Sequence, residues 1–244
     1  GQITWSPRVE NFPSVLSISG AELGDRLMEQ AMAQGAEVEL DEIVSLSRSG
    51  EYFTARSEFG AEFTARAVIV AAGAKPRMLG LEREEELVGN GVCFCAVCDG
   101  AFYRGAHVAV VGGGNVATDC AVTAARSGAE SVEMFIRRRV CDMRISKSEH
   151  LELLAMGITP NGMMSPEKIE LNGDLKTLYV HKNICRNGKW MPLPNSTVAL
   201  PYFSLIIRAI GSRADAKPDL PPENLVYAGD CKTGGSTIVE AIAS

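Results

Sequence analysis

Apolar residues near the start of the chain recur at the spacing of an amphipathic helix. Leu23, Leu27 and Ala31 follow one another at every fourth position, so they share one face of a helix. Gly35 comes soon after them and belongs to the residue type that most often ends a helix with a positive φ. The pattern therefore predicts a helix over residues 20–35.

Downstream, short apolar or alternating runs bounded by glycine and polar residues predict strands. Two of these runs flank Phe59-Gly60 and predict a hairpin. The run 67–72 is continuously apolar, as expected of a parallel strand that is buried on both faces. A helix is predicted over 115–127, ended by Gly128. The predicted strands are 36–46, 51–57, 61–67, 67–72, 106–111, 131–136, 175–183 and 203–210.

The alternation of apolar strands with helices predicts an α/β protein built on doubly wound parallel sheets. Composition agrees, because only 6% of the 244 residues are aromatic while 24 are glycines. The net charge of −6 argues against a broad nucleic-acid surface. The longest apolar run, 67–74, is eight residues, against about 18 for a membrane helix. No basic and apolar leader opens the sequence, so we expect a cytoplasmic protein without a membrane segment.

A glycine-rich turn lies between the predicted strand 106–111 and the helix that follows it. Residues 112–117 read GGGNVA and match the pattern G-x-G-x-x-A of dinucleotide-binding proteins. In this pattern Gly112 permits the tight turn, Gly114 lets the backbone approach a pyrophosphate, and Ala117 allows close packing of helix on strand. The free N–H groups of the helix N-terminus attract the anion. The predicted contacts are Gly112, Gly114, Asn115, Val116 and Ala117.

The end of the next strand indicates which dinucleotide binds. Sites for NAD usually place an acid there, about 20 residues after the glycines, to bind the ribose hydroxyls. Here 131–136 is followed instead by arginines, and Glu133 lies inside the strand rather than at its end. Guanidinium groups suit a 2′-phosphate, so the sequence favours NADPH over NADH. The predicted phosphate ligands are Arg137, Arg138, Arg139 and Arg144.

Two of the seven cysteines form a C-x-x-C pair, Cys95 and Cys98, directly followed by Asp99. Seven cysteines are too few for a disulfide scaffold in a chain of this length. Half of a zinc site is an alternative, but no second pair and no histidine cluster accompanies it, so we expect no metal. A pair of inert buried cysteines is the other alternative. A redox dithiol fits better, with Asp99 placed to move a proton to or from a thiolate.

These motifs together resemble a known family. Residues 95–105 (CAVCDGAFYRG) and 108–115 (VAVVGGGN) are similar to bacterial-type, low-molecular-weight thioredoxin reductases of the pyridine nucleotide-disulfide oxidoreductase family. That family carries its redox C-x-x-C in the NADPH domain, just before the glycine loop. Shorter segments resemble the flavin side of the same family. They are 9–13, 18–23, 71–77 and 228–230.

The resemblance implies two Rossmann-like domains, with the NADPH-binding domain (80–205) inserted into the FAD-binding domain (1–79 and 206–244). The family's first strand, glycine loop and helix for FAD are absent from the sequence. Hinges between the domains would lie at 78–80 and 201–204. By the same resemblance, FAD would contact Gln2, Asn11, Ala72, Gly73, Gly229, Asp230, Thr237, Ile238 and Val239.

The implied function is an electron relay from NADPH to FAD, then to the Cys95–Cys98 disulfide, and finally to a thioredoxin-like partner disulfide. In this family the cysteine beside the acid faces the flavin, so Cys98 would take that position and Cys95 would exchange with the partner. A homodimer is also implied.

Two other interpretations stay open. Segments 137–149 and 229–241 resemble the flavin-bearing small subunit of NADPH glutamate synthase, which would make the chain an electron-delivering subunit with an incidental dithiol. The second is a non-catalytic NADP-binding remnant or truncated form, because the usual start of the FAD domain is missing.

Overall fold

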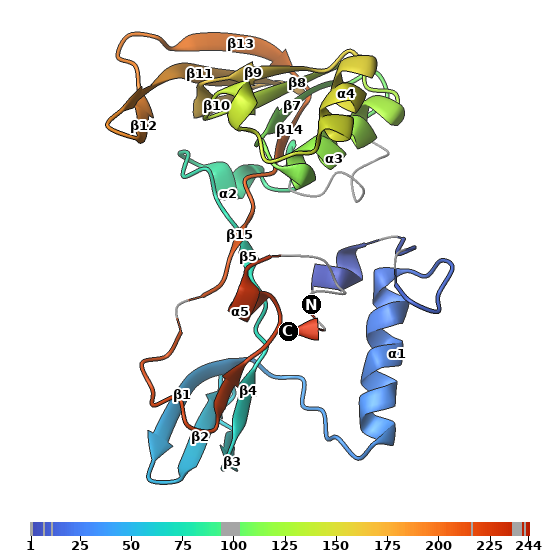
Figure 1. Cartoon of the computed structure of the whole chain (residues 1–244), viewed down its shortest axis with the longest axis vertical. Coiled ribbons are helices and arrows are strands. Elements are labelled where there is room, and N and C mark those ends of the chain that lie inside the picture. Colours follow the sequence, from blue (N-terminus) through green and yellow to red (C-terminus); the bar gives the residue numbers. More distant parts are fainter. Residues whose placement is uncertain are drawn as a thin grey trace. The chain divides into compact units, whose positions relative to one another are not determined.

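The chain divides into two units, which Figure 1 draws in a computed structural model. The continuous unit is Pro76–Gly211, and the split unit is formed by Gly1–Lys75 and Ser212–Ser244. Short strands β5 (Lys75–Pro76) and β15 (Ser212–Arg213) lie where the chain passes from one unit to the other. The structure describes all residues except Gly1, Pro7, Asn11, 94–102, Ala216, 236–240 and Ile242.

The expected domain boundaries differ from these units by a few residues. An end of the inserted domain at residue 205 would cut β14 (Leu205–Arg208), which belongs to the central sheet of the continuous unit. The expected hinge at 201–204 overlaps β13 (Val198–Phe203), which is paired with β11. The second crossing therefore lies at Gly211–Ser212, after this pairing has ended.

A parallel sheet forms the centre of the continuous unit, as the sequence predicts. Its order is β6-β14-β7-β8-β9, and every neighbouring pair is parallel. Helices α3 and α4 lie on the same side of this sheet in Figure 1. The elements are β6 (Val92–Cys93), β7 (His107–Val111), α3 (Asn115–Arg126), β8 (Ser131–Ile136), η3 (Val140–Asp142), α4 (Lys147–Ala155) and β9 (Thr159–Gly162).

The two faces of the central strand β7 bury alternate residues in two separate cores. Val108 and Val110 pack in a cluster with residues of α3 and α4. Ala109 and Val111 belong to a second cluster, which includes Phe135 of β8 and residues of an antiparallel sheet. Successive side chains of a strand point to opposite faces, so burial on both faces requires the continuous apolar run seen in the sequence.

The antiparallel sheet is the part of this unit that the sequence analysis recognised least. It contains β10 (Met164–Asn172), β11 (Leu175–Arg186), β12 (Lys189–Pro192) and β13 (Val198–Phe203). Only residues 175–183 of β11 and the last residue of β13 fall within predicted strands. The strand predicted over 203–210 is β14, which begins at Leu205. Exposed, charged and proline residues interrupt β10, β12 and β13, so their apolar pattern is weak.

In the split unit, helix α1 (Gly20–Ala33) matches its prediction. The Ser19 side chain accepts the Glu22 N–H at 3.1 Å at its start, and Gly35 follows its end with a φ of +92°. The predicted hairpin is also present as β2 (Tyr52–Ser57) and β3 (Glu62–Ala65), which pair antiparallel. The prediction of a strand over 36–46 is wrong in part. Strand β1 (Ile43–Ser49) begins at Ile43, the first of its residues that pairs with β2.

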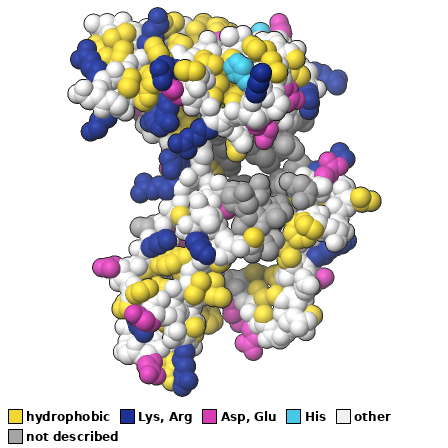
Figure 2. Space-filling view, viewed as in Figure 1, with side chains coloured by type: hydrophobic (Ala, Val, Ile, Leu, Met, Phe, Trp, Pro, Cys, Tyr) yellow, Lys and Arg dark blue, Asp and Glu magenta, His cyan; other side chains and the backbone are white. Residues whose placement is uncertain are grey.

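The prediction of a buried strand at 67–72 is also wrong in part. Strand β4 (Val68–Val70) pairs in parallel with β16 (Leu225–Tyr227), as a parallel strand should. However, Ile69 is 70% exposed, because the described residues of this two-stranded sheet leave its face uncovered. Figure 2 shows hydrophobic side chains at the surface of this unit. Its remaining elements are η1 (Gln2–Trp5) and α5 (Asp230–Thr233). None of the described helices has the length and hydropathy needed to span a bilayer.

Candidate functional site

The glycine loop between β7 and α3 has the shape that its sequence predicts. Gly112 has a φ of +149°, and a Cβ there would lie 2.2 Å from the Ala209 carbonyl oxygen and 2.9 Å from the Ala117 Cβ. Only glycine therefore fits at this turn, and Ala117 is fully buried directly beneath it. A Cβ on Gly114, in contrast, would have no atom within 4 Å. The last glycine of the loop therefore faces open space that a ligand can fill.

Helix α3 begins at this open position without a side-chain cap. Gly114 is its N-cap residue, and no side chain accepts a hydrogen bond there. The first N–H groups of an uncapped helix are available to an anion. The Arg144 N–H donates to the Gly113 carbonyl oxygen at 3.3 Å, which brings a second segment alongside the loop.

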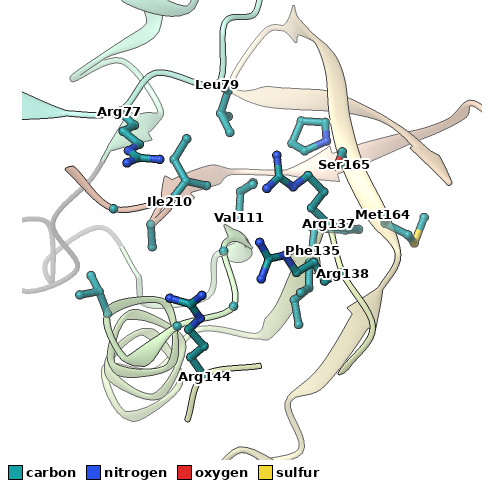
Figure 3. Close-up of a pocket in the computed structure, with 18 of the residues that line it drawn as sticks. Arg77, Leu79, Val111, Phe135, Arg137, Arg138, Arg144, Met164, Ser165 and Ile210 are labelled. Carbon is teal, nitrogen blue, oxygen red and sulfur yellow. The ribbon is translucent and has the colours of Figure 1, made fainter. Parts of the chain in front are cut away.

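A cleft of about 640 Å³ opens over this loop, and all of its lining residues belong to the continuous unit. Figure 3 shows that its walls come from several segments of the chain. All five residues predicted for the glycine loop and its helix take part in this region, although Ala117 lies below the cleft surface rather than on it. The cleft is lined by Arg77–Leu79, Val111–Val116, Phe135–Arg138, Asp142, Arg144, Met164–Pro166 and Ala209–Gly211.

Three of the four predicted arginines line this cleft. Arg137 and Arg138 follow the end of β8, and Arg144 lies beside the glycine loop (Figure 3). Arg139 is not among the residues that line it. Its Nη2 and Nε instead donate to the two carboxylate oxygens of Asp142 at 2.8 and 3.0 Å. The hydrogen bond to Arg139 lowers the pKa of Asp142, so this carboxylate stays ionised and paired.

Among the residues that the structure describes, no carboxylate takes the position at the end of β8 where an acid would bind ribose hydroxyls. Glu133 lies within the strand, as the sequence predicts, and accepts a hydrogen bond from the Tyr202 hydroxyl at 2.9 Å. Burial, together with this hydrogen bond, raises the pKa of Tyr202 to about 12. Asp142 is the only acid among the described residues that line the cleft, and its carboxylate already accepts hydrogen bonds from Arg139. The electrostatic character of the cleft is therefore set by guanidinium groups.

Arg77 is a further cleft residue that the sequence analysis did not assign to the nucleotide. It was grouped with the flavin-side segment 71–77, but the structure places it on the cleft wall of the continuous unit (Figure 3). Its backbone N–H donates to the Gly211 carbonyl oxygen at 2.9 Å. The only sequence signal was a cation a few residues after a predicted strand, which is common at protein surfaces.

In the split unit, the pairing of β4 with β16 brings two of the predicted flavin segments together. The Ala228 N–H donates to the Val70 carbonyl oxygen at 3.0 Å, so the residues that follow both strands lie at one edge. Gln2 joins them, because its side-chain amide donates to the Ala74 carbonyl oxygen. Gly73 and Gly229 have φ angles of +70° and +69°.

These residues expose backbone and amide groups at the carboxyl ends of parallel strands, where α/β proteins bind ligands. Ala72 is exposed, Asp230 is half-buried, and a Cβ on Gly73 would meet no atom within 4 Å. The donor set therefore fits the polar part of a flavin nucleotide. Asn11, Thr237, Ile238 and Val239 lie outside the described residues.

Cys95, Cys98 and Asp99 also lie outside the described residues. The segment that contains them is bounded on both sides by buried residues of the continuous unit. Cys93 ends β6, and Tyr103 is fully buried in the core that contains α3. In the sequence, the C-x-x-C motif lies between these two buried residues, within the range Pro76–Gly211 that also contains the residues lining the cleft.

Comparison with known proteins agrees with this architecture. The chain is 43% identical over 119 residues to a thioredoxin reductase of Bacillus subtilis, which covers 49% of this chain and 37% of the relative. It is 35% identical over 195 residues to a thioredoxin reductase of Streptomyces coelicolor, covering 80% of this chain and 59% of the relative. The chain thus spans between about two fifths and three fifths of these relatives.

A solved structure shares the fold over the whole chain. The thioredoxin reductase of Lactococcus lactis superimposes with a TM-score of 0.78 at 23% identity, covering all of this chain and 83% of that one. The family described as pyridine nucleotide-disulphide oxidoreductase matches residues 2–217. The glycine loop, the parallel sheet and this match lead to one conclusion: the chain belongs to the pyridine nucleotide-disulphide oxidoreductase family.

Proposed function

We propose that this protein is an NADPH-dependent flavoprotein disulfide reductase. The proposal is carried by one observation: the glycine loop at the uncapped N-terminus of α3 and three arginines line one cleft. The sequence of the same unit, Pro76–Gly211, contains the C-x-x-C motif. The names of the relatives support a thioredoxin-like protein as the electron acceptor. A homodimer and a cytoplasmic location are part of the same proposal.

In this proposal the continuous unit binds NADPH. The pyrophosphate lies against the glycine loop and the N-terminus of α3, where backbone N–H groups meet it. Arg137, Arg138 and Arg144 bind the 2′-phosphate, because a guanidinium donates two parallel hydrogen bonds to a phosphate. Asn115 and Val116 lie at the first turn of the helix, within the cleft lining.

The split unit holds FAD in this proposal. Gln2, Ala72, Gly73, Gly229 and Asp230 supply the polar contacts described above, together with Asn11 and residues 237–239. The chemistry that FAD would supply here, once bound, is acceptance of a hydride from NADPH and delivery of the electron pair to a disulfide. The chain's own part is to hold the two nucleotides and to provide the dithiol.

The dithiol passes its electron pair to the partner disulfide in two successive thiol–disulfide exchanges. The Cys95 thiolate attacks one sulfur of the partner disulfide, forms a mixed disulfide and releases the other partner sulfur as a thiolate. Cys98 then attacks the Cys95 sulfur, which closes the Cys95–Cys98 disulfide and releases the second partner thiol. Asp99 takes up the proton of the attacking Cys98. One electron pair moves from this chain to the partner in each cycle.

An absorbance spectrum tests the proposal most directly. The purified chain is mixed with FAD, freed of unbound flavin, and titrated with NADPH without oxygen. We expect a yellow protein that NADPH bleaches, with about one additional reducing pair stored as dithiol. A colourless protein after FAD addition would overturn the flavin part for this chain and favour a non-catalytic NADP-binding form. Unchanged electron delivery with the dithiol blocked would instead favour a subunit like that of glutamate synthase.

Nucleotide selectivity gives a second test, with a matched control. Replacing Arg138 by alanine removes a guanidinium from the cleft, so we expect NADP⁺ to bind about tenfold or more weakly while NAD⁺ affinity is unchanged. Arg139→Ala is the control, because this neighbouring arginine pairs with Asp142 instead of lining the cleft. Calorimetric titration of both nucleotides measures the effect. Equal losses for NADP⁺ and NAD⁺ in Arg138→Ala would contradict a 2′-phosphate contact.

A further inference from the structure

A buried ion pair lies next to the nucleotide cleft without lining it. The Nη1 of Arg208 and the Oε1 of Glu84 are 2.5 Å apart, and both side chains are only 2% exposed. Arg208 is the last residue of β14, and Glu84 is the first residue of the short helix α2 (Glu84–Leu87). A charge that is buried this completely needs a structural or functional reason, because desolvating it is costly.

The carboxylate of Glu84 organises the backbone that precedes it. Its two oxygens accept the N–H groups of three consecutive residues, Leu79, Gly80 and Leu81, at 2.9, 2.8 and 3.3 Å. Gly80 has a φ of +78°, which turns successive N–H groups toward one acceptor. Glu84 therefore fixes the conformation of residues 79–81, and Arg208 fixes Glu84.

Both partners of the pair connect to the same wall of the cleft. Residues Arg77–Leu79 line the cleft directly before the backbone that Glu84 holds. Ala209–Gly211 line it directly after Arg208. The Arg77 N–H donates to the Gly211 carbonyl oxygen at 2.9 Å, and the Met78 sulfur contacts the Arg208 guanidinium, so the two strips of wall are joined.

The strand order indicates which half of a dinucleotide this wall would meet. The glycine loop follows β7, the cleft arginines Arg137 and Arg138 follow β8, and the wall joined to Arg208 follows β14 on the other side of β7. A dinucleotide lies across the carboxyl ends of the strands with its pyrophosphate at the glycine loop. With the 2′-phosphate on the β8 side, the nicotinamide half reaches the β14 side, where Arg77 stands (Figure 3).

We propose that the Glu84–Arg208 pair is a positioning pair that holds Arg77 at the nicotinamide end of the cleft, where its guanidinium binds the phosphate of the nicotinamide half. This inference rests on the proposed function, since it needs the dinucleotide in that cleft. Arg77 touches the ligand, whereas Glu84 and Arg208 act through Arg77. Arg137 and Arg138 on the β8 side and Arg77 on the β14 side then bind the two ends of the same molecule.

Two probe nucleotides separate the two ends. NADP⁺ carries both halves, whereas 2′,5′-ADP carries only the adenosine half and its 2′-phosphate. We expect Arg77→Ala to weaken NADP⁺ binding about tenfold or more, as for a lost charged hydrogen bond, and to leave 2′,5′-ADP binding unchanged. Because Arg77 is exposed, this variant should fold normally. Titration calorimetry on the full chain measures both affinities.

Glu84→Gln should also weaken the binding of NADP⁺ but not of 2′,5′-ADP. A neutral amide accepts the N–H groups of residues 79–81 more weakly than the carboxylate does, and the arginines on the β8 side are unchanged. The double variant with Arg77→Ala should lose no more than Arg77→Ala alone, since both changes remove one contact. Arg208→Met should also lose NADP⁺ affinity, and Arg208→Lys should restore part of it. Glu86→Gln is the matched control on α2, because Glu86 is exposed and pairs only with Arg83 in the described contacts, at 2.8 Å.

The outcomes separate this inference from the proposed function. If the unaltered chain binds neither nucleotide, the proposed NADPH site is wrong. If it binds both and Arg77→Ala binds NADP⁺ as tightly, only the role of Arg77 is wrong. Additive losses in the double variant, or equal losses of both nucleotides in Glu84→Gln, would overturn the positioning role. Should Glu84→Gln fail to fold, the comparison of Arg208→Met with Arg208→Lys decides the same question.

Discussion

Cys95→Ser is expected to abolish reduction of a partner disulfide, while NADPH still reduces the bound flavin. The serine hydroxyl is not a thiolate at neutral pH and forms no mixed disulfide, so the exchange step loses its nucleophile. Turnover of a thioredoxin-like substrate should fall by a factor on the order of 10³ or more. Stopped-flow bleaching of the flavin and steady-state NADPH consumption with the partner measure the two steps separately.

Cys98→Ser gives the complementary result. With Cys95 present and its resolving partner removed, the chain should remain linked to the substrate as a mixed disulfide, visible by mass spectrometry. Cys141→Ser and Cys185→Ser are controls, since both cysteines are exposed and lie outside the C-x-x-C motif. Full turnover by Cys95→Ser would show that the dithiol is incidental. If Cys95→Ser formed the adduct through Cys98, and Cys98→Ser formed none, the roles of the two thiols would be reversed.

Glu84→Ala is expected to lower the free energy of unfolding of the continuous unit by about 3–5 kcal/mol. The change leaves the Arg208 charge buried without its carboxylate and removes the acceptor for three backbone N–H groups. Glu86→Ala on the same helix is the control, and an exposed pair of this kind contributes about 1 kcal/mol or less. Urea unfolding followed by Trp190 fluorescence, in a Trp5→Phe background, reports on the continuous unit. Equal midpoints for the two variants would contradict the role of the buried pair.

The same residue makes the stability depend on pH in a defined direction. Burial alone would raise the pKa of Glu84, but hydrogen bonds from the Leu79 N–H, from Arg208 and from the next two N–H groups outweigh it and lower the pKa below 4.5. A lowered pKa in the folded state means that the stabilisation is present above the unfolded value and is lost as the pH falls through the folded value. The difference between the unaltered chain and Glu84→Ala should therefore shrink in acid below pH 4.5. A constant difference from pH 7 to pH 3 would show that ionised Glu84 is not the stabilising species.

Local sequence patterns correctly predicted the helices and strands whose apolar spacing is visible within the element itself. The strand predicted over 131–136 coincides with β8, because its residues are apolar enough to be buried, and the helix predicted over 115–127 matches α3 to within one residue, because Gly128 follows its apolar period. The glycine loop was predicted from its local pattern, and the structure adds a second constraint, because a Cβ on Gly112 would meet Ala117 of α3 and the carbonyl group of Ala209 after β14. In these places local chemistry and tertiary packing require the same residues.

Where burial or strand formation depends on pairing with other parts of the chain, the sequence patterns predicted the structure less accurately. The apolar run at 67–72 indicated a buried strand, yet burial depends on what covers a sheet, and Ile69 is exposed in the two-stranded pairing with β16. The strands β10, β12 and β13 were missed because each is stabilised by pairing in the sheet around β11 rather than by its own apolar period.

By itself, the sequence determined the family of the protein and predicted the chemistry that we propose for it. The spacing of glycines, arginines and cysteines follows from what a pyrophosphate, a 2′-phosphate and a dithiol each need within a few residues of chain. Only the tertiary structure separated Arg139 from its neighbours and brought Arg77 to the cleft. It also paired Glu84 with Arg208, which lie 124 residues apart. Such contacts depend on which strands lie side by side, and no local pattern of residues encodes that adjacency.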